Sequence, residues 1–596
     1  METVSRRTIL ILAAAVLLLR LPFLNQAIQG DDVYYLAGAQ HAQINPLHPN
    51  HTSYAFLGDM VDMRGHPHPP LNAWFLGLLL AAFGDVSEVP FHTAYIVFSL
   101  IAAGAMLSLA RRFSPHPRWA VLLFCAVPAF VINGNSFESD VPFLAFWMAS
   151  VAAFASGRAG LAALAMALAA LTAFQAVLLT PVLWAHTWIF RRGERRWWLL
   201  ALVPPLAIAA WQGFEYAATG ALPAAVLQGH FDRYGFQALE RKLANAAALS
   251  VHALFLVFPM LLIPAARRVW RSPDREAFWL VAWAGIFFAG ALAIFFAGSA
   301  RYLLPMAAPV ALLVSRLPVP WLAAGWALQW TLSLGLATVN YQHWDGYRRF
   351  VEDLRPHAEN RRVWINSEWG LRWYLEAEGG LPLLNGQAVR PGDLVVSSAL
   401  GYPMAFTTGG GVLTPVAERE IRPEIPLRLI GLETRSAYST IVNGYLPFDV
   451  SRGPIDRVRA DLVVERAPEH SWLRMADEAA AAQIVSGVYG IEEGRFRWMG
   501  ERAVLLLKSP PQPAPLRAVI YVPDAAPARK VTLRLDGEIV AERTFDGAGQ
   551  YEISTPGLRP APGSATVAVE VDRTFSVPGD RRVLGAILVE AGFAPE

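Results

Sequence analysis

The stretch that decides the fold is the apolar run TILILAAAVLLLRLPFL, residues 8–24, followed at once by QGDDVYY, residues 29–35. A run of about 17 residues is the lower limit for a helix that crosses a bilayer. Arg6 and Arg7 precede the run and are expected to stay in the cytoplasm under the positive-inside rule. The sequence therefore predicts a membrane helix that delivers Asp31 and Asp32 to the extracytoplasmic face.

A second polar cluster stands just before the next apolar run. Residues 65–71 read Gly-His-Pro-His-Pro-Pro-Leu and contain His66 and His68. Because the chain has to return to the same face before it enters the membrane again, these imidazoles are expected near Asp31 and Asp32. Acid and imidazole side chains would then meet at one membrane surface.

The composition indicates a membrane domain followed by a large soluble part. Of the 596 residues, 54% are hydrophobic and only 16% are charged. Apolar runs follow one another up to Asn340, and the remaining part, about 250 residues or enough for two ordinary domains, has none long enough to span. The net charge of +2 comes without a basic stripe, which argues against nucleic acid. The single cysteine, Cys125, excludes an intramolecular disulfide.

Eleven segments are predicted to span the membrane. The segment 161–190 is longer than a bilayer needs and contains Pro181, so it is expected to be tilted, kinked or broken. The N-terminal run lacks a small-residue cleavage motif and is interpreted as a retained anchor, with a signal peptide as the competing interpretation. The predicted spans are 8–24, 70–84, 92–112, 118–133, 141–157, 161–190, 197–217, 246–264, 277–297, 301–315 and 319–339.

Loop charges agree with this count except at one place. With a cytoplasmic N-terminus, the basic loops 191–196 and 267–275 fall in the cytoplasm, whereas Arg301 and the C-terminal part fall outside. Arg111, Arg112 and Arg118 also land outside, against the rule. Either a weak helix is miscounted, or these arginines bind an anion on the outer face.

Four motifs in order carry a resemblance to a known family. The acidic pair Asp31-Asp32 is followed by Tyr34 and Tyr35; a His-Pro-Pro-Leu element begins at His68; Ser-Asp-Val-Pro-Phe spans 139–143; and Arg-Tyr-Leu-Leu-Pro begins at Arg301. The chain resembles the polyprenol-phosphate-sugar-dependent glycosyltransferases of the GT-C fold, the branch with protein O-mannosyltransferases and the lipid A aminoarabinose transferase.

The resemblance implies a single inverting displacement without a covalent enzyme intermediate. Asp31 would act as the general base, and Asp32 would position the acceptor or join a metal site. The implied donor is a polyprenyl-phosphate sugar, and the acceptor is an extracytoplasmic glycan, lipid or protein. Two departures from the family pattern stand out: Asp32 replaces the usual Glu, and Phe174-Gln175 stands where relatives often have Lys-Tyr.

Further roles follow from position and chemistry. Arg301 is the first candidate for the donor phosphate, because an arginine can pair with phosphate through two bonds; Tyr302, His68, Arg111 and Arg112 are the other phosphate candidates. Asp31 with His66 could hold a divalent ion. Structural alternatives remain open: the acids as solvated caps, the histidines as loop-shaping residues, Asp140 as a helix cap and Arg301 as an anchor to lipid headgroups.

The part after the membrane domain divides in two. Residues 341–485 contain a strand, helix, strand, strand pattern from Arg361 to Ser397, which predicts an extracytoplasmic α/β domain. Residues 486–596 contain short alternating strands, among them 516–522, 531–535 and 565–571, which predict a β-sandwich. The stretch Pro578 to Gly585 before the last strand is similar to a jelly-roll module appended to membrane glycosyltransferases.

The sequence as a whole predicts a polytopic α-helical membrane protein of GT-C type, residues 1–340, with a C-terminal α/β domain and a β-sandwich. It is interpreted as a glycosyltransferase of the plasma membrane that moves a hexose or pentose, with its C-terminal domains outside. The alternative is a transporter or flippase of lipid-linked glycans, although no internal repeat of the kind expected for a transporter was found.

Overall fold

The computed structural model describes residues 6–235, 238–436, 444–524, 526, 528–577, 580 and 582–594. The chain forms two compact units that are not contiguous in sequence. The first, called the helical unit here, comprises residues 1–54, 62–348 and 421–456. The second, called the β-rich unit, comprises residues 55–61, 349–420 and 457–596. The predicted boundary at Asn340 is therefore not respected. Residues 421–456 lie after it but belong to the helical unit, and residues 55–61 lie before it but belong to the β-rich unit.

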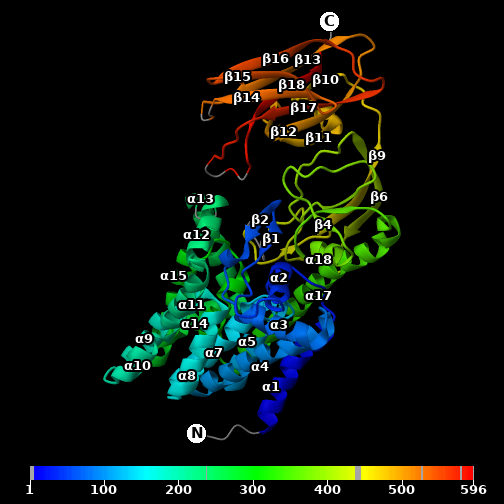
Figure 1. Cartoon of the computed structure of the whole chain (residues 1–596). Coiled ribbons are helices and arrows are strands. Elements are labelled where there is room, and N and C mark those ends of the chain that lie inside the picture. The colour runs from blue at the N-terminus through cyan, green and yellow to red at the C-terminus, as the bar shows by residue number, and fades with distance from the viewer. Residues whose placement is uncertain are drawn as a thin grey trace. The chain divides into compact units, whose positions relative to one another are not determined.

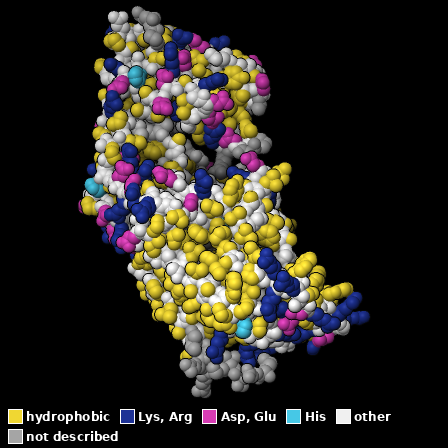
Figure 2. Space-filling model, turned by 180° about the vertical axis from the view of Figure 1, so that it is seen from behind, with side chains coloured by type: hydrophobic (Ala, Val, Ile, Leu, Met, Phe, Trp, Pro, Cys, Tyr) yellow, Lys and Arg dark blue, Asp and Glu magenta, His cyan; other side chains and the backbone are white. Residues whose placement is uncertain are grey.

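The helical unit is built from helices (Figure 1), several of which are long and apolar. Hydrophobic side chains cover most of its visible face, with Lys and Arg gathered toward its lower end (Figure 2). Its helices are α1 (Arg6–Arg20), α2 (Asp32–Ala42), α3 (Leu71–Phe83), α4 (Glu88–Phe113), α5 (Pro117–Cys125), α6 (Pro128–Asn133), α7 (Asp140–Ala155), α8 (Ala159–Thr172), α9 (Leu179–Phe190), α10 (Arg195–Leu200), α11 (Val203–Thr219), α12 (Pro223–Arg233), α13 (Leu239–Ala253), α14 (Pro259–Arg271), α15 (Arg275–Ile294), α16 (Leu304–Val314) and α17 (Val319–Ala358), with the 3₁₀ turns η1 (Leu21–Phe23), η2 (Met63–Gly65), η3 (Phe174–Leu178) and η4 (Ala300–Leu303).

Four helices among the described residues are long and apolar enough to cross a membrane. They are Glu88–Phe113, Arg195–Thr219, Arg275–Ile294 and Val319–Ala358. Shorter apolar helices cover most of the other predicted spans, including Asp140–Ala155 and Ala159–Thr172. The total of eleven crossings stays a prediction.

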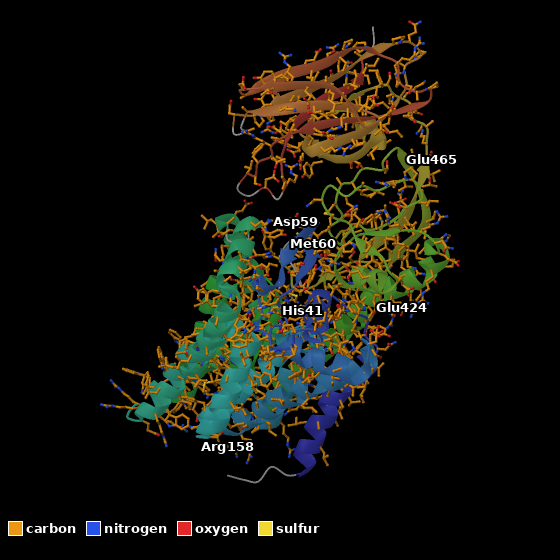
Figure 3. The ribbon with its side chains drawn as sticks, in the orientation of Figure 1. His41, Asp59, Met60, Arg158, Glu424 and Glu465 are labelled. Atoms are coloured by element: carbon orange, nitrogen blue, oxygen red, sulfur yellow. The ribbon has the colours of Figure 1, made fainter. Side chains whose placement is uncertain are left out.

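Contacts at the helix ends separate two ends of the helical unit. At one end, Arg191 donates hydrogen bonds to the carbonyl oxygens of Phe154 and Ala155 at 3.2 and 3.0 Å, and Arg112 donates to the same Ala155 oxygen. Arg158, which follows α7, lies at the lower end of the unit in Figure 3. We call this the basic end.

At the other end, called the Asp31 end here, the chain returns several times. Asn135 lies against His92 near the start of α4, with 3.2 Å between the His92 Nε2 and the Asn135 oxygen. His68 lies 3.4 Å from the carbonyl oxygen of Thr172, the last residue of α8. Asn340 of α17 donates to Gln29 at 2.5 Å. These contacts bring the end of α8 and the middle of α17 to the same end as Asp31.

Two predicted spans are revised by these contacts. The segment 70–84 does not run to the basic end, because α3 lies beside α2, with Gln43 donating to the Gly77 oxygen at 2.8 Å, and α4 then starts from the Asp31 end. The segment 161–190 runs twice between the two ends, because Thr172 lies at the Asp31 end and both Ala159 and Phe190 adjoin the basic end. The Pro181-containing segment is broken as expected, at η3.

Arg20 shows how a charge inside the first apolar run is accommodated. Its buried guanidinium donates to the oxygens of Val131 and Phe130 at 2.6 and 2.7 Å and to Ser99 at 3.1 Å. These carbonyls lie in the last turn of α6, where the Phe130 oxygen also accepts from the Gly134 nitrogen and the Val131 oxygen from the Asn135 side chain, both at 3.3 Å. Gly134 is required beside it, because an added Cβ would lie 1.8 Å from the guanidinium carbon.

The β-rich unit contains the predicted α/β element. Strands β3 and β5 pair in parallel, β4 adds to the other side of β3, and β9 pairs antiparallel with β5, so that the order is β4-β3-β5-β9-β6. The strand, helix, strand, strand pattern is confirmed. Its elements are β3 (Val363–Asn366), α18 (Trp369–Ala377), β4 (Leu381–Pro382), β5 (Leu394–Ser398), β6 (Gly411–Ile421) and β9 (Asp456–Glu465).

The short alternating strands predicted for the C-terminal part are present, and nine strands among the described residues are joined by hydrogen bonds into one sheet. Their division into the two layers of a β-sandwich stays a prediction. The predicted strands at 516–522, 531–535 and 565–571 are present, and the turn at Asp536-Gly537 has positive φ at both residues, 47° and 93°. The sheet already includes β10, so it begins before residue 486. Pro578 and Arg581 of the jelly-roll-like stretch lie outside the described residues. The strands are β10 (Trp472–Arg474), β11 (Ile484–Glu492), β12 (Phe496–Lys508), β13 (Ala514–Val522), β14 (Arg529–Leu535), β15 (Glu538–Phe545), β16 (Gly549–Leu558), β17 (Ser564–Val571) and β18 (Ala586–Phe593).

Candidate functional site

Asp31 stands on a tight turn that precedes α2. The turn is closed by a hydrogen bond of 2.9 Å from the Asp32 nitrogen to the Gln29 oxygen, and Gly30 has a φ of +44°. A side chain at Gly30 would be strained by this backbone and would place its Cβ 2.8 Å from Glu138. The Asp31 nitrogen donates to the same carboxylate at 3.2 Å. The turn is thus fixed against the 133–140 segment.

Arg301 gathers three carboxylates around one guanidinium. It pairs with Asp31 at 3.2 Å and with Glu138, and Asp140 is 3.9 Å away. The Arg301 and Glu138 side chains are only 10% and 5% exposed, whereas Asp31 is 41% exposed. Asp31 is therefore the acid that a ligand can reach. The guanidinium also lies 5.4 Å from the Tyr302 ring, as expected for neighbours in the predicted phosphate motif.

Asp32 points into the protein instead of toward this cluster. It is fully buried and accepts hydrogen bonds from Ser136 and the Phe137 nitrogen, both at 2.8 Å, and from the Gln29 nitrogen at 3.1 Å. Burial raises the pKa of its carboxyl to about 7, and the three donors oppose that rise. With its oxygens taken, Asp32 joins two loops and does not face an acceptor, in contrast to the predicted catalytic role.

His66 and His68 lie against the Tyr35 ring. Ring centroids are 4.8 Å apart for Tyr35 and His66 and 5.5 Å apart for Tyr35 and His68. Burial lowers the pKa of His66 to about 4 and holds the pKa of His68 well below its usual value, helped by His66 and the Arg301 charge. Both rings are therefore neutral near pH 7. The sequence made His68 a candidate for binding the donor phosphate, and a neutral ring brings no positive charge to that role.

His68 has a defined tautomer. Its Nδ1 lies 3.4 Å from the Thr172 carbonyl oxygen, and because that oxygen can only accept, Nδ1 carries the proton. The Nε2 atom is then an acceptor. The Thr172 contact brings the loop before α3 against the end of α8.

No carboxylate accompanies His66 in the contacts of the described part of the chain, so the suggested pair of Asp31 and His66 gains no third ligand there. Within the described residues, the group of three side chains that could hold an ion is His48, His51 and Glu215 instead. The sequence predicted a divalent ion on Asp31 and His66, whereas the side chains that converge closely enough to hold one are a different set.

Arg111 and Arg112 lie at the basic end, away from Asp31. Arg112 contacts Ala155, the last residue of α7, whereas Asp140, the first residue of α7, lies near Arg301. Sixteen residues of helix rise about 24 Å. The two arginines therefore cannot share a phosphate with Arg301. The revised course of the segment 70–84 would move both arginines to the cytoplasmic side of the predicted topology, which stays a prediction.

Sequence reasoning missed Glu138 and misplaced Asp140. The predicted count left Asp140 in the cytoplasm, whereas it stands at the Asp31 end. Glu138, two residues before it, is the buried partner of both Arg301 and the Asp31 nitrogen. Two acids on either side of Ser139, directly before an apolar run, were the available signal.

Comparisons with known proteins find similarity only in structure. The sequence matches no protein-family model and no curated protein. The structure is similar to ArnT from Cupriavidus metallidurans bound to undecaprenyl phosphate, with 13% identity, a TM-score of 0.43, and 66% of this chain and 94% of that chain covered. It is also similar to the arabinofuranosyltransferase AftD from Mycobacteria, with 13% identity, a TM-score of 0.38, and 99% of this chain and 58% of that chain covered. At these scores, function has to be argued from the side chains of this chain.

Proposed function

We propose that the protein is an integral-membrane glycosyltransferase that moves a sugar from a polyprenyl-phosphate donor to an extracytoplasmic acceptor. The observation that carries the proposal is the half-exposed carboxylate of Asp31, held by a buried arginine at one end of an apolar helical unit. A carboxylate that is reachable and fixed in place suits the general base of a group transfer. A nearby guanidinium suits an anionic leaving group.

The proposed reaction is a single inverting displacement. The acceptor hydroxyl gives its proton to the Asp31 carboxylate as its oxygen forms a bond to the anomeric carbon. The bond between that carbon and the phosphate oxygen breaks, and the electron pair leaves with polyprenyl phosphate. Asp31 needs no covalent bond to the sugar in this scheme.

Arg301 has to change partners for the donor to bind. Three carboxylates face one guanidinium, so the cluster carries more negative than positive charge. The phosphate therefore competes with Asp31 for the guanidinium, while Glu138 keeps its buried contact. The buried Nε of Arg301, which has no hydrogen-bond partner among the described residues, offers a further donor. Donor binding would in this way release Asp31 to act as the base.

An ion on Asp31 and His66 would offset part of the negative charge. His66 is neutral, as a metal ligand must be, yet its described neighbours are the rings of Tyr35 and His68. The proposed reaction therefore assigns no role to a metal at this place.

The proposed orientation puts the Asp31 end outside and the basic end in the cytoplasm. The arginines that contact the end of α7 and the basic loop 191–196 gather at one end, which the positive-inside rule assigns to the cytoplasm. Asn340 reaches Gln29 at the Asp31 end, so the chain after Asn340 leaves the membrane there.

Protease added to intact spheroplasts is expected to remove the C-terminal part after residue 358. Opening the inner membrane should be needed before the loop 191–196 is cut. Complete protection of the C-terminal part in sealed spheroplasts would contradict the orientation.

The proposed activity can be tested with the purified full chain in proteoliposomes. Polyprenyl-phosphate sugars are supplied with extracts of cell-envelope glycans, lipids and proteins as acceptors, and mass spectrometry follows the products. The proposal expects a new glycosidic product and free polyprenyl phosphate in equal amounts. Movement of the intact donor across the bilayer without cleavage would instead support the flippase alternative.

A further inference from the structure

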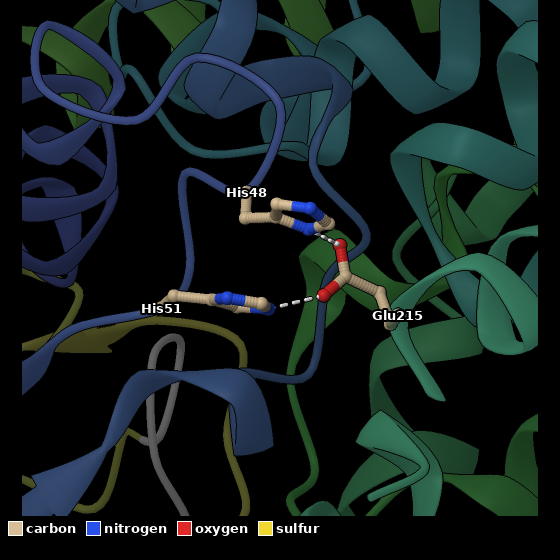
Figure 4. A group of neighbouring side chains, drawn as sticks. All are labelled: His48, His51 and Glu215. Carbon is tan, nitrogen blue, oxygen red and sulfur yellow. Dashed lines mark hydrogen bonds and ion pairs between the residues drawn. The ribbon is translucent and has the colours of Figure 1, made fainter. Parts of the chain in front are cut away.

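A second cluster of polar side chains lies in the helical unit and takes no part in the proposed reaction. His48 and His51 stand in the loop 43–52 that follows α2, and Glu215 stands near the C-terminal end of α11. The two rings lie one above the other, with both facing the Glu215 carboxylate (Figure 4).

The ligand atoms converge as they would around a small cation. His48 Nδ1 is 3.2 Å from Glu215 Oε1, His51 Nε2 contacts Oε2, and all three ligand atoms lie within 4.8 Å of one another. Metal–ligand bonds of 2.0–2.1 Å in a tetrahedral zinc site place neighbouring ligand atoms roughly 3.3 Å apart. Side-chain adjustments of about 1 Å would therefore complete the coordination.

Aromatic stacking holds the two imidazole rings of the cluster in place. The His48 and His51 rings stack with centroids 4.4 Å apart and planes 15° from parallel, and Phe214 stacks on the other face of His48 at 4.8 Å. The Glu215 side chain is 6% exposed, whereas His48 and His51 are 16% and 18% exposed. A buried carboxylate beneath partly open rings leaves a route for an ion from solvent.

The donor set selects the class of ion. Two imidazole nitrogens with one carboxylate suit zinc, whereas magnesium and calcium prefer oxygen ligands. Zinc sites with two histidines and one glutamate keep a fourth position for water. Nearby, Arg64 and Asp62 pair with each other through three hydrogen bonds between their side chains, and the Arg64 guanidinium also feels the charge of Glu215.

We propose that His48, His51 and Glu215 form a zinc site that fastens the loop 43–52 to α11. The loop follows α2, the helix that begins directly after Asp31, and Glu215 lies 164 residues beyond His51. An ion that joins such distant segments stabilises the folded helical unit, because the unfolded chain does not hold the ligands together. The site is independent of the transfer reaction and remains even if that proposal fails.

The test uses the purified full chain in detergent, stripped with a chelator and dialysed. Isothermal titration with zinc is expected to give one tight site, and elemental analysis one zinc per chain after removal of free metal. Loss of a direct ligand should weaken binding by at least about a hundredfold, since even outer-shell changes cost 10–100-fold. His51→Gln and Glu215→Gln test this, and His116→Gln, at the start of α5, is the matched control.

A second readout covers variants that fold poorly. Zinc should raise the melting temperature of the wild type and of His116→Gln, but not that of His48→Gln. X-ray absorption of the wild type should give two imidazole nitrogens in the zinc shell. If the wild type binds no zinc, or if His51→Gln and Glu215→Gln bind zinc as tightly as the wild type does, the cluster is only a proton-bridged pair of histidines and a carboxylate, and the proposal is wrong.

Discussion

The two ends of the helical unit use arginine in opposite ways. At the basic end, Arg112 and Arg191 donate to backbone oxygens at the end of α7, and Arg191 lies 4.2 Å from the Trp197 ring. At the Asp31 end, Arg301 is held by carboxylates at the start of the same helix. Helix α7 therefore has acids at its N-terminus, and arginines from other segments contact its C-terminus, as its dipole favours.

The different partners of these arginines indicate two roles, one in fixing helix ends and one in the proposed reaction. Arginines on carbonyl oxygens and aromatic rings are satisfied by atoms that do not titrate, so they fix helix ends. Arg301 pairs instead with Asp31, a side chain that is exposed enough to exchange its partner for a ligand. Variants at the basic end should consequently change the stability of the fold, whereas variants at the Asp31 end should change donor binding and turnover.

The largest expected effect on stability concerns acid sensitivity of the Asp31 end. The pKa of buried His66 is lowered from 6.5 to about 4, so the unfolded chain binds the proton first as the pH falls. The contribution of His66 to stability, fully present above pH 6.5, is then lost between pH 6.5 and 4, by roughly 3 kcal/mol. The Asp32 carboxyl, whose pKa is raised, contributes with the opposite sign, so the comparison with His66→Gln isolates the histidine. Thermal unfolding of His66→Gln should depend less on pH in this window, whereas His116→Gln at the basic end should behave as the wild type. Equal slopes for all three proteins would contradict the assignment.

Donor affinity should depend on Arg301 and not on Arg112. Arg301→Ala is expected to weaken binding of a polyprenyl-phosphate sugar ten- to a hundredfold, because a charged hydrogen bond contributes about 1.5–3 kcal/mol. Arg301→Lys should keep part of the affinity, since it retains the charge but not the planar geometry. Titration of the donor measures both, with Arg112→Ala as control. If Arg301→Ala binds the donor as tightly as the wild type, Arg301 only forms ion pairs with Asp31 and Glu138 and does not bind the phosphate.

The smallest expected effect concerns Asp32. In Asp32→Asn, one acceptor oxygen becomes a donor and meets one of the three N–H or O–H groups that now bind the carboxylate. The change should destabilise the fold by about 1–3 kcal/mol. Turnover of the folded fraction should stay within a few-fold of the wild type. A folded Asp32→Asn protein without turnover would show that Asp32 takes part in catalysis, as the sequence predicted.

The sequence predicted the apolar bundle, the α/β element and the C-terminal strands, because these depend on hydrophobic period and turn residues. It placed Asp31 and Arg301 at one end, where the structure pairs them. Hydropathy could not show that the run at 71–83 lies beside α2, since a helix that packs against another helix at one end of the bundle can be as apolar as a membrane-spanning helix. It could not separate Asp31 from Asp32 either, because successive residues on a turn can point to solvent and to the interior.

The identity of Asp31 as the base is tested most directly by turnover of Asp31→Asn in proteoliposomes at saturating donor. Loss of a general base should lower the rate by about 10²–10⁴. Asp85→Asn, an exposed acid in the turn between α3 and α4, is the matched control and should keep wild-type turnover. The protein should remain folded and bind donor at least as tightly, because Arg301 loses a competing partner. A folded Asp31→Asn protein that retains half of the wild-type turnover would contradict the account.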